Sequence, residues 1–307
     1  MILAIYNTAD YFILKKAAQM SVAAHMAFNP LQNKLKESKG TNAIYQPAGA
    51  AREYAPYASN LYIGCSGMCK YCYNKRGPRA GTLGNNYVTL KKCFGTEGDA
   101  IVVFFLELFG GNGGTVRYEL LSNGIFICFT TDPCLPETFP LHAAIIAEAI
   151  KLGVPFKILT KVTDWLGSEI WQDLKCIPEA KEKLSIGVTL TGRDDLEPGV
   201  SSNQDRVNAL SYLHNEGFKT FASIEPVIDS ALSLSIIQAC VGFVDLFMVG
   251  LESNRHYDKG EVVQFVNALA AIPEKPTIYL KDSIMGYFVG YTRASFGPNF
   301  INTVPVL

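Results

Sequence analysis

The chain has 307 residues, 18% of them charged, and a formal net charge of −1 at pH 7. This length suits one large α/β barrel domain. The near-zero charge excludes a strong global basic field of the kind that marks many nucleic-acid-binding proteins, although a local basic groove remains open. The apolar runs at 101–106 and 241–249 are too short, or too interrupted by acidic residues, to span a bilayer, so we expect no membrane segment.

The cysteine content and the N-terminus predict a cytoplasmic location. Eight cysteines are spread along the chain. The N-terminus has no basic start followed by an apolar core and a small-residue cleavage site, which is the pattern of a secretory leader. We therefore expect a reducing compartment, in which these cysteines stay free and most of them pack in the interior.

From residue 56 onward, short β-branched or aromatic runs alternate with longer helical patterns, which is typical of parallel β/α units. The strands are expected at Ser59–Ile63, Ile125–Thr130, Phe156–Thr160, Leu184–Thr189, Thr220–Ile224, Asp245–Val249 and Thr277–Leu280. The helices are expected near Pro140–Leu152, Asp164–Leu174, Asn203–Glu216, Leu232–Cys240 and Glu261–Ala270. This order predicts an α/β fold, an incomplete TIM-like barrel of six to seven β/α units with an N-terminal extension.

The predicted boundaries divide the chain into three parts. Residues 1–43 form the N-terminal extension, whose apolar residues between 2 and 14 are expected to build a strand and a helix that close the base of the barrel. Residues 44–290 form the partial barrel, and residues 291–307 form a C-terminal tail.

The most informative motif is formed by Cys65, Cys69 and Cys72, spaced C-x3-C-x2-C just after the first expected barrel strand. Three thiolates from one tight loop can hold three irons of a [4Fe–4S] cube and leave the fourth iron open to a ligand. Gly64 and Gly67 suit such a loop, because glycine adopts backbone conformations that a Cβ resists. The motif therefore predicts a cluster with an open iron.

Structural zinc is the main alternative for these cysteines. A structural zinc site takes four ligands, usually as two pairs. The next cysteine, Cys93, lies well beyond the motif, and no histidine stands close to it. A cluster thus fits the ligand set better than zinc does.

Polar residues follow six of the expected strands, where a barrel of this class gathers its reactive groups. Strand ends also tend to be polar because they reach the surface, so each position taken alone has this simpler explanation. The residues concerned are Thr130 to Asp132, Thr160 and Lys161, Thr189 to Thr191, Glu225, Glu252 and Ser253, and Lys281 and Asp282.

The cysteine motif, with an aromatic residue before its last cysteine, resembles that of the radical S-adenosylmethionine (SAM) superfamily. Within it, the chain is similar to the branch related to spore photoproduct lyase, often labelled DNA repair photolyase. The similarity keeps the order of the branch over roughly residues 44–230. It rests on the run 44–73, Thr130 to Pro133 with Glu137, Leu159 to Lys161, Thr189 to Thr191, Glu197 and Pro198 with Arg206, and Glu225 with Pro226.

The resemblance implies a set of cofactor contacts. It implies that Tyr71 packs beside the cluster and presents its backbone to adenine, that Thr131 and Asp132 lie near the methionine amino group or the ribose, that Lys161 lies near the SAM carboxylate, and that Thr189 lies near SAM polar atoms. The charges agree, since an ammonium complements a carboxylate. The alternative for Lys161 is a solvated lysine that follows a strand.

The resemblance also raises the question of a hydrogen donor. In spore photoproduct lyase, a cysteine returns a hydrogen atom to the product radical, and its position corresponds here to Phe129. Cys128 comes before it and is expected to point to the other face of the strand. Cys134, at the rim, is the better placed thiol and our predicted donor, the alternative being a small packed residue.

The function predicted from these features is reductive cleavage of SAM and hydrogen abstraction in the repair or modification of a nucleic-acid base, with flavodoxin or ferredoxin as the electron donor. The alternatives are radical modification of a peptide or small metabolite, and an iron–sulfur protein that does not cleave SAM. A basic region interleaved with tyrosines could contact nucleic acid, although solvated charges explain it equally. Its residues are Lys70, Lys75, Arg76, Arg79, Lys91 and Lys92. Asp194, Asp195 and Glu197 are interpreted as a solvated loop.

Overall fold

A computed structural model describes residues 6–26, 42–110, 115–253 and 255–305. Its main sheet has eight strands in the order β1-β2-β5-β6-β7-β8-β9-β10. The seven strands from β2 to β10 in this order run parallel, and β1 pairs antiparallel with β2 at one edge. An α/β partial barrel of seven parallel strands is therefore confirmed, with β1 and β10 as its edges.

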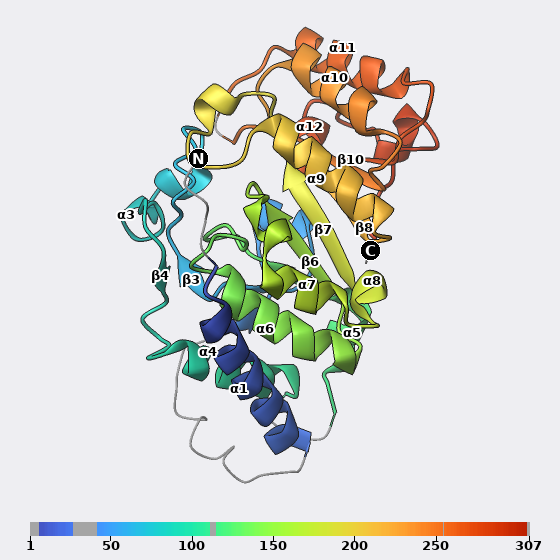
Figure 1. Ribbon diagram of the computed structural model, residues 1–307. Helices are drawn as coiled ribbons and strands as arrows, with labels where there is room; N and C mark the ends of the chain where they lie inside the picture. The colour runs from blue at the N-terminus through green and yellow to red at the C-terminus, as the bar shows by residue number, and fades with distance from the viewer. Residues whose placement is uncertain (1–5, 27–41, 111–114, 254, 306–307) are drawn as a thin grey trace.

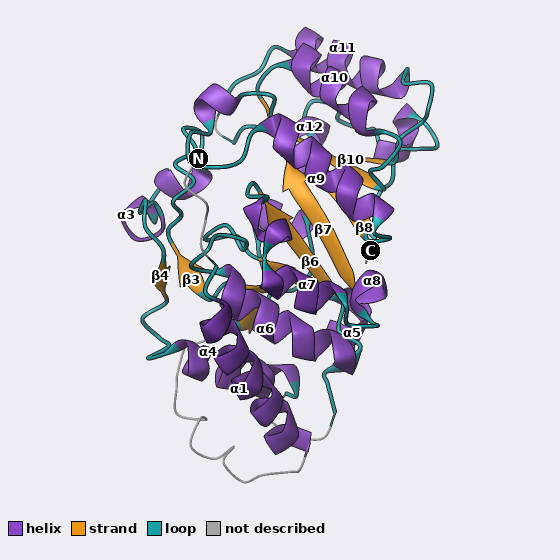
Figure 2. Ribbon diagram, viewed as in Figure 1, coloured by secondary structure: helices purple, strands orange, loops and turns teal. Residues whose placement is uncertain are grey.

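The strands of the main sheet lie side by side with helices around them (Figures 1 and 2). The bounds of these strands are β1 Ile44–Tyr45, β2 Ala58–Ser59, β5 Ile125–Ile127, β6 Phe156–Thr160, β7 Leu184–Thr189, β8 Lys219–Val227, β9 Leu246–Leu251 and β10 Ile278–Leu280. The helices are α1 Thr8–Met26, α3 Ala80–Leu83, α4 Glu97–Leu108, α5 Tyr118–Asn123, α6 Phe139–Ala149, α7 Glu169–Lys175, α8 Ala180–Lys183, α9 Asn203–Asn215, α10 Ser230–Cys240, α11 Lys259–Ala270 and α12 Asp282–Met285.

The expected strand at Ser59–Ile63 is in fact two strands in two sheets. β2 ends at Ser59, and β3, Tyr62–Ile63, pairs with β4, Thr89–Leu90, in a separate small sheet. Asn60 lies at the break, and its Oδ1 accepts a hydrogen bond from the Phe129 N–H at 2.7 Å. Because this side chain satisfies a backbone group of the neighbouring segment, the chain can leave the sheet there and turn toward the cysteines.

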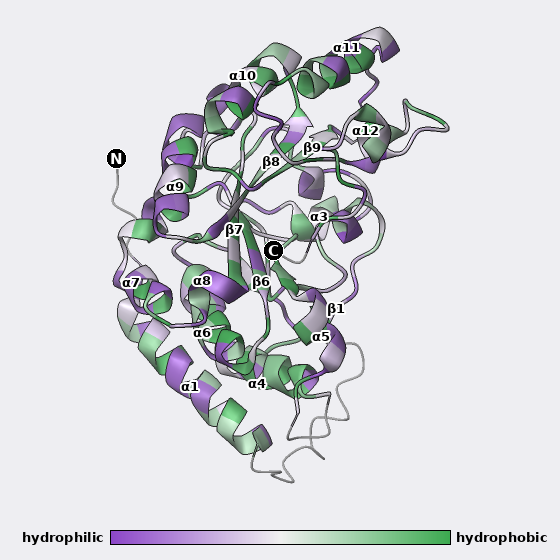
Figure 3. Ribbon diagram, turned by 90° about the vertical axis from the view of Figure 1, so that its right-hand side faces the viewer, coloured by the Kyte–Doolittle hydropathy of each residue, from purple (hydrophilic) through white to green (hydrophobic). Residues whose placement is uncertain are grey.

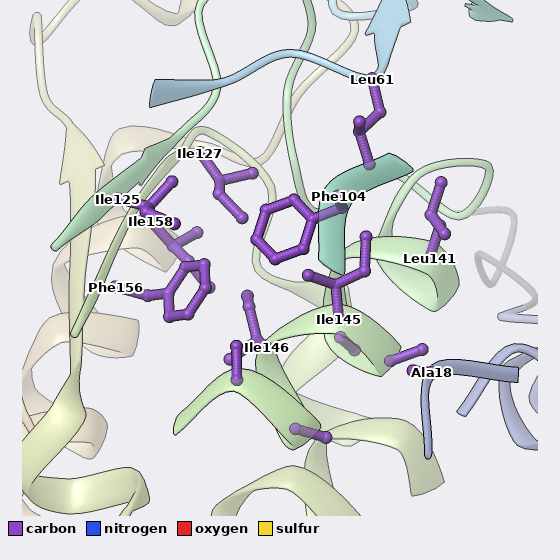
Figure 4. Packing of buried hydrophobic residues seen from close by; sticks show 14 of the residues in the cluster. Ala18, Leu61, Phe104, Ile125, Ile127, Leu141, Ile145, Ile146, Phe156 and Ile158 are labelled. Atoms are coloured by element: carbon purple, nitrogen blue, oxygen red, sulfur yellow. The ribbon is translucent and has the colours of Figure 1, made fainter. Parts of the chain in front are cut away.

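Alternate residues of each strand face two different cores. Ile125 and Ile127 of β5 pack outward with Ile158 of β6 against α4 and α6, where Phe104 and Ile145 lie (Figure 4). Inward-facing residues form a second core inside the barrel, which includes Phe126, Phe221, Leu246, Met248 and Tyr279. Period-two alternation thus buries both faces of the sheet.

The N-terminal helix α1 covers the outer helices. Its buried side chains Tyr11, Leu14 and Ala18 recur at helical spacing, and it packs against α4 and α6. Figure 3 shows the corresponding alternation of hydrophilic and hydrophobic bands along its ribbon. None of the helices in the described parts of the chain is long and apolar enough to cross a membrane.

C-terminal residues cover the base of the barrel, whereas α1 of the N-terminal extension packs against outer helices. The strand expected near residue 2 falls on residues 1–5, outside the described part of the chain. Ile301 and Val304 pack against the interior core, and the buried Lys157 of β6 donates a hydrogen bond to the Pro305 carbonyl at 2.5 Å. A helix forms at Thr8–Met26 and buries Tyr11 and Leu14, but the apolar pattern could not show that these residues pack against the outer helices.

Gly187 of β7 is essential for packing inside the barrel. A Cβ added there would lie 2.4 Å from the Phe221 ring, which is almost fully buried. We expect Gly187→Ala to lower the free energy of unfolding by about 1–3 kcal/mol, because the ring must move in a packed core. Urea denaturation tests this against Gly242→Ala, where a Cβ meets no atom within 4 Å. Equal stabilities of the two variants would contradict the packing argument.

Lys157 gives the fold a defined pH dependence. Burial lowers its pKa from 10.5 to about 8 in the folded chain. Between these values the unfolded chain binds more protons, so this residue makes stability rise as pH increases from about 8 toward 10.5. We expect the wild type to gain stability relative to Lys157→Met over this range, measured by urea denaturation at several pH values. A difference in stability between the two proteins that does not change with pH would show that the pKa of Lys157 is not lowered in the folded chain.

Candidate functional site

A cavity of about 440 Å³ opens at the carboxyl ends of the barrel strands. The three motif cysteines line it, and so do all five residues predicted to contact SAM. These eight residues are Cys65, Cys69, Cys72, Tyr71, Thr131, Asp132, Lys161 and Thr189. They come from the cysteine loop, β5, β6 and β7, so the fold brings together residues that lie up to 124 positions apart, from 65 to 189.

Two glycines shape the cysteine loop. Gly64 has a φ of +80°, and a Cβ there would lie 2.1 Å from the Tyr87 carbonyl oxygen. The Gly67 N–H donates to Cys65 Sγ at 3.3 Å, and a Cβ on Gly67 would lie 3.3 Å from Cys65 Sγ and 4.0 Å from Cys69 Sγ. A Cβ on Gly67 would also lie 2.8 Å from Val200 Cγ1, so glycine lets the loop pack closely against Val200 while its amide N–H points at a sulfur atom.

The arrangement of the sulfurs suits a cluster. Burial raises the pKa of the Cys65 thiol to about 11 and that of Cys69 above its usual value. A bound cation offsets this cost, because metal ligation favours the thiolate. The described residues form no group of three or more Cys, His, Asp or Glu around a single ion. A cube presents a separate iron to each thiolate that holds it, and all three motif cysteines line the same cavity.

The loop at 194–200 holds the cysteine loop in place. The Lys70 N–H donates to the Leu196 carbonyl at 2.9 Å, and the Gly199 N–H donates to the Gly67 carbonyl at 3.2 Å. A Cβ on Gly199 would lie 2.5 Å from the Ser66 carbonyl oxygen. The two loops are thus in backbone contact, and glycine permits the close approach.

A buried ion pair supports this contact. Glu197 pairs with Arg206 of α9, and both side chains are fully buried. Tyr71 donates a hydrogen bond to Glu197, and Arg206 donates to the Thr189 carbonyl at 2.5 Å. Burial and the neighbouring Glu197 raise the pKa of Tyr71, so its hydroxyl stays protonated and donates. Lys161 Nζ lies 4.0 Å from Glu197 and 5.3 Å from the Tyr71 ring centroid.

The interpretation of Glu197 as part of a solvated loop is wrong. An acidic residue among Asp194, Asp195 and a proline looks exposed, and both aspartates are exposed, whereas Glu197 is buried. The partner that buries Glu197 lies nine residues further on, in a helix. The sequence contained one sign of this pair, because Glu197 and Arg206 are both among the residues that match the branch related to spore photoproduct lyase.

Asp132 organises the ends of β5 and β6. Its carboxylate accepts hydrogen bonds from Thr160 Oγ1 at 2.6 Å, from the Cys134 N–H at 2.9 Å and from the Lys161 N–H at 2.7 Å. Burial raises its pKa, and these donors oppose the increase. The adjacent Thr131 Oγ1 is buried, lines the cavity and has no hydrogen-bond partner among the described residues. Thr131 thus brings an unsatisfied buried hydroxyl to the cavity wall, a group that needs a hydrogen-bond partner.

Cys128 and Cys134 follow β5, and their placement relative to the cavity is the reverse of what the sequence suggested. Cys134 is fully buried in the outer core and does not line the cavity, whereas Cys128 lines it and contacts the Thr131 carbonyl at 3.3 Å. β5 ends at Ile127, so strand alternation does not extend to Cys128 and the expectation that it points away is wrong. The role of Cys134 as a hydrogen donor stays a prediction.

No family model matches the chain. An uncharacterized protein of Methanocaldococcus jannaschii is 24% identical over 66% of this chain and 70% of its own length. An uncharacterized protein of Mycobacterium bovis is 25% identical over 61% of this chain, and the match spans 54% of that protein.

Two solved structures resemble this chain over about three quarters of its length. A variant of spore photoproduct lyase matches with a TM-score of 0.54 and 15% identity over 76% of this chain and 78% of that one. SuiB of Streptococcus suis, bound to its precursor peptide SuiA, matches with a TM-score of 0.51 and 13% identity over 74% and 48% of the two chains. The chain has the fold of these radical SAM enzymes. At these identities the likeness concerns the fold, and the chemistry rests on the site.

Removing one member of the buried Glu197–Arg206 pair is expected to destabilise the fold. Glu197→Gln removes the fully buried carboxylate and leaves Arg206 only the exposed Asp194, 3.6 Å away, so we expect a loss of about 3 kcal/mol in the free energy of unfolding, the lower end of the cost of breaking a buried pair. Asp195→Asn breaks an exposed pair with Arg193, and we expect a change of about 1 kcal/mol or less. Urea denaturation of both variants measures the contrast, and similar losses would show that the buried pair carries no special weight.

Proposed function

We propose that this chain is a radical SAM enzyme that reductively cleaves SAM at a [4Fe–4S] cluster, in the repair or modification of a nucleic-acid base by a lyase-type reaction resembling that of photoproduct repair. The observation that carries the proposal is that the three motif cysteines and all five predicted SAM contacts line one cavity. When bound, the cluster and SAM supply a one-electron cleavage to methionine and a 5′-deoxyadenosyl radical for hydrogen abstraction, and the protein orients the reacting groups.

Cys65, Cys69 and Cys72 are proposed to hold the cluster. Because Gly67 carries no side chain, their loop can pack against Val200 with the Gly67 N–H directed at Cys65 Sγ. The contacts of the loop with 194–200, together with the hydrogen bond from Tyr71 to Glu197, hold the cysteines against the cavity. Such support restricts a metal-binding loop to one geometry.

The residues at the ends of β5 to β7 are proposed to bind SAM. Lys161 carries the ammonium that would meet the SAM carboxylate, and its side chain is held between Glu197 and the Tyr71 ring. Thr131 offers its unsatisfied hydroxyl, and Thr189 lies at the same rim. Asp132 accepts two hydrogen bonds on Oδ1 and one on Oδ2, so Oδ2 retains capacity for the methionine amino group or the ribose.

The proposed substrate is a nucleic-acid base. One structure that resembles the chain is spore photoproduct lyase complexed with a dinucleoside spore photoproduct, with a TM-score of 0.50 over 67% of this chain and 59% of that one. Arg76 of the expected basic region lines the cavity and pairs with Glu252 at 2.6 Å, so a cation stands where a phosphate could approach. SuiB, bound to a peptide, supports peptide modification as the second candidate. Flavodoxin or ferredoxin is proposed as the electron donor.

An anaerobic assay tests the chemistry. The reconstituted, dithionite-reduced chain is expected to form 5′-deoxyadenosine from SAM and to contain about four irons per chain. Cys65→Ala, Cys69→Ala and Cys72→Ala should each abolish the product, because each removes one iron ligand. Cys93→Ala and Cys176→Ala, at exposed positions, should retain it. An intact cluster without 5′-deoxyadenosine would favour an iron–sulfur protein that does not cleave SAM.

A further inference from the structure

The side of the cavity formed by β8 to β10 carries a second polar group, separate from the proposed SAM contacts. Glu225 belongs to β8, and Lys281 directly follows β10. Both side chains line the cavity. Glu225 shares the inward face of β8 with Phe221 and Ser223, as the period-two rule requires.

The two side chains form a close ion pair with unused hydrogen-bonding capacity. Lys281 Nζ donates to Glu225 Oε2 at 2.6 Å, and the Tyr54 hydroxyl donates to the same oxygen at 2.7 Å. Lys281 is only 2% exposed, and its ammonium makes one hydrogen bond among the described residues, although it has three N–H donors; a second carboxylate, that of Glu53, lies 3.7 Å from it, beyond hydrogen-bond distance. The described residues place no hydrogen bond on Glu225 Oε1. A donor and an acceptor thus remain available at the cavity wall.

Gly250 of β9 keeps this pair open to the cavity. It lies between the two strands that carry the charges, and a Cβ there would lie 3.0 Å from Glu225 Oε1 and 3.0 Å from Lys281 Cδ. Any larger residue would therefore push against both members of the pair. The absence of a side chain at this position leaves space beside the free carboxylate oxygen.

Aromatic rings stand next to the pair. Tyr54, Phe126 and Phe129 all line the cavity. Phe126 and Phe129 stack with ring centroids 4.4 Å apart, and the Tyr54 centroid lies 5.1 Å from that of Phe126. Lys281 Nζ sits 4.3 Å from the Tyr54 ring centroid. An ammonium, a carboxylate and planar apolar surfaces therefore occur together.

We propose that the Lys281–Glu225 pair reads the hydrogen-bonding edge of a nucleobase drawn into the cavity, the base lying against the aromatic rings. The proposal rests on the proposed function and names a part of the substrate. Lys281 donates to a carbonyl or ring-nitrogen acceptor, and Glu225 accepts from the adjacent N–H. Enzymes that act on a single base read it in this way, by hydrogen bonds to its edge and by stacking. A buried ion pair adds little stability on its own, so its placement at a cavity favours recognition.

Binding of two matched oligonucleotides tests this proposal. The probes are fluorescently labelled pentathymidylate and the same oligomer methylated on N3 of every thymine, which removes the N–H but keeps the rings and phosphates. Fluorescence anisotropy is measured anaerobically with the reconstituted chain and SAM. We expect the wild type to bind the unmethylated oligomer roughly tenfold more tightly, since a paired base edge gives discrimination of this order.

The double variant Glu225→Leu/Lys281→Met replaces the pair by apolar side chains of similar size, a change that folded proteins often tolerate. We expect it to bind both oligomers with equal affinity. The matched control is Lys175→Met/Glu216→Leu, which removes another lysine–glutamate pair, at 3.2 Å between α7 and the end of α9 and away from the cavity lining. It should keep the tenfold preference. Thermal unfolding of each variant confirms that the fold is retained, and Glu225→Gln alone provides a milder second test with a reduced preference.

Three outcomes would overturn the proposal: equal binding of both oligomers by the wild type, a preference that survives in the double variant, or no binding of either oligomer. Formation of 5′-deoxyadenosine by the same preparation without oligonucleotide separates this failure from that of the proposed function. Product without discrimination removes the role of the pair and leaves SAM cleavage standing, whereas absence of product contradicts the radical chemistry itself.

Discussion

The contact between the cysteine loop and the 194–200 loop, supported by the buried Glu197–Arg206 pair, is the constraint on which the site depends. The cysteine loop leaves the main sheet after β2 and contains no long helix or strand of its own. A loop of this kind needs partners that fix it. Backbone hydrogen bonds to Leu196 and from Gly199, together with the Tyr71 hydroxyl on Glu197, provide them. Because Arg206 also binds the Thr189 carbonyl, the same ion pair links the loop to the end of β7.

The cavity consequently has two chemically distinct sides. On the β5 to β7 side, Asp132 ties neighbouring strand ends together through Thr160 and Lys161, so that small and charged side chains lie near the cysteines. On the β8 to β10 side, the Lys281–Glu225 ion pair lines the cavity. The Tyr54 ring lies beside this pair and contacts the stacked rings of Phe126 and Phe129 from the β5 segment. The separation fits a reaction in which a cofactor and a substrate must meet in one enclosure while each is bound by its own residues.

Much of this arrangement follows from local sequence. The bounds of β6 and β7 agree with those expected, since their apolar runs are bordered by clear breaks. The cysteines and the polar strand ends were recognisable because parallel strands deliver their ends to one rim. The split of the expected strand at 59–63 could not be recognised from local sequence, because it depends on the contact of Asn60 with Phe129, 69 residues away.

The parts that could not be predicted are those set by distant partners. Glu197 looks like a surface acid until α9 brings Arg206 to it. Cys128 lines the cavity because β5 ends at Ile127, so the alternation of side chains along the strand does not extend to Cys128. Glu225 and Lys281, 56 residues apart, were expected at the same rim, but their pairing became visible only when the sheet order placed their strands on either side of β9. In each case the course of the backbone through the fold decides which side chains come into contact, and the residue types alone do not reveal it.

The central claim is that the cysteine loop holds a cluster whose open iron faces the SAM residues across the cavity. The most direct measurement is the electron paramagnetic resonance spectrum of the reduced, reconstituted chain before and after addition of SAM. The account predicts a [4Fe–4S] signal that changes when SAM is added, because SAM binds the iron without a cysteine. A cluster signal identical with and without saturating SAM would contradict it.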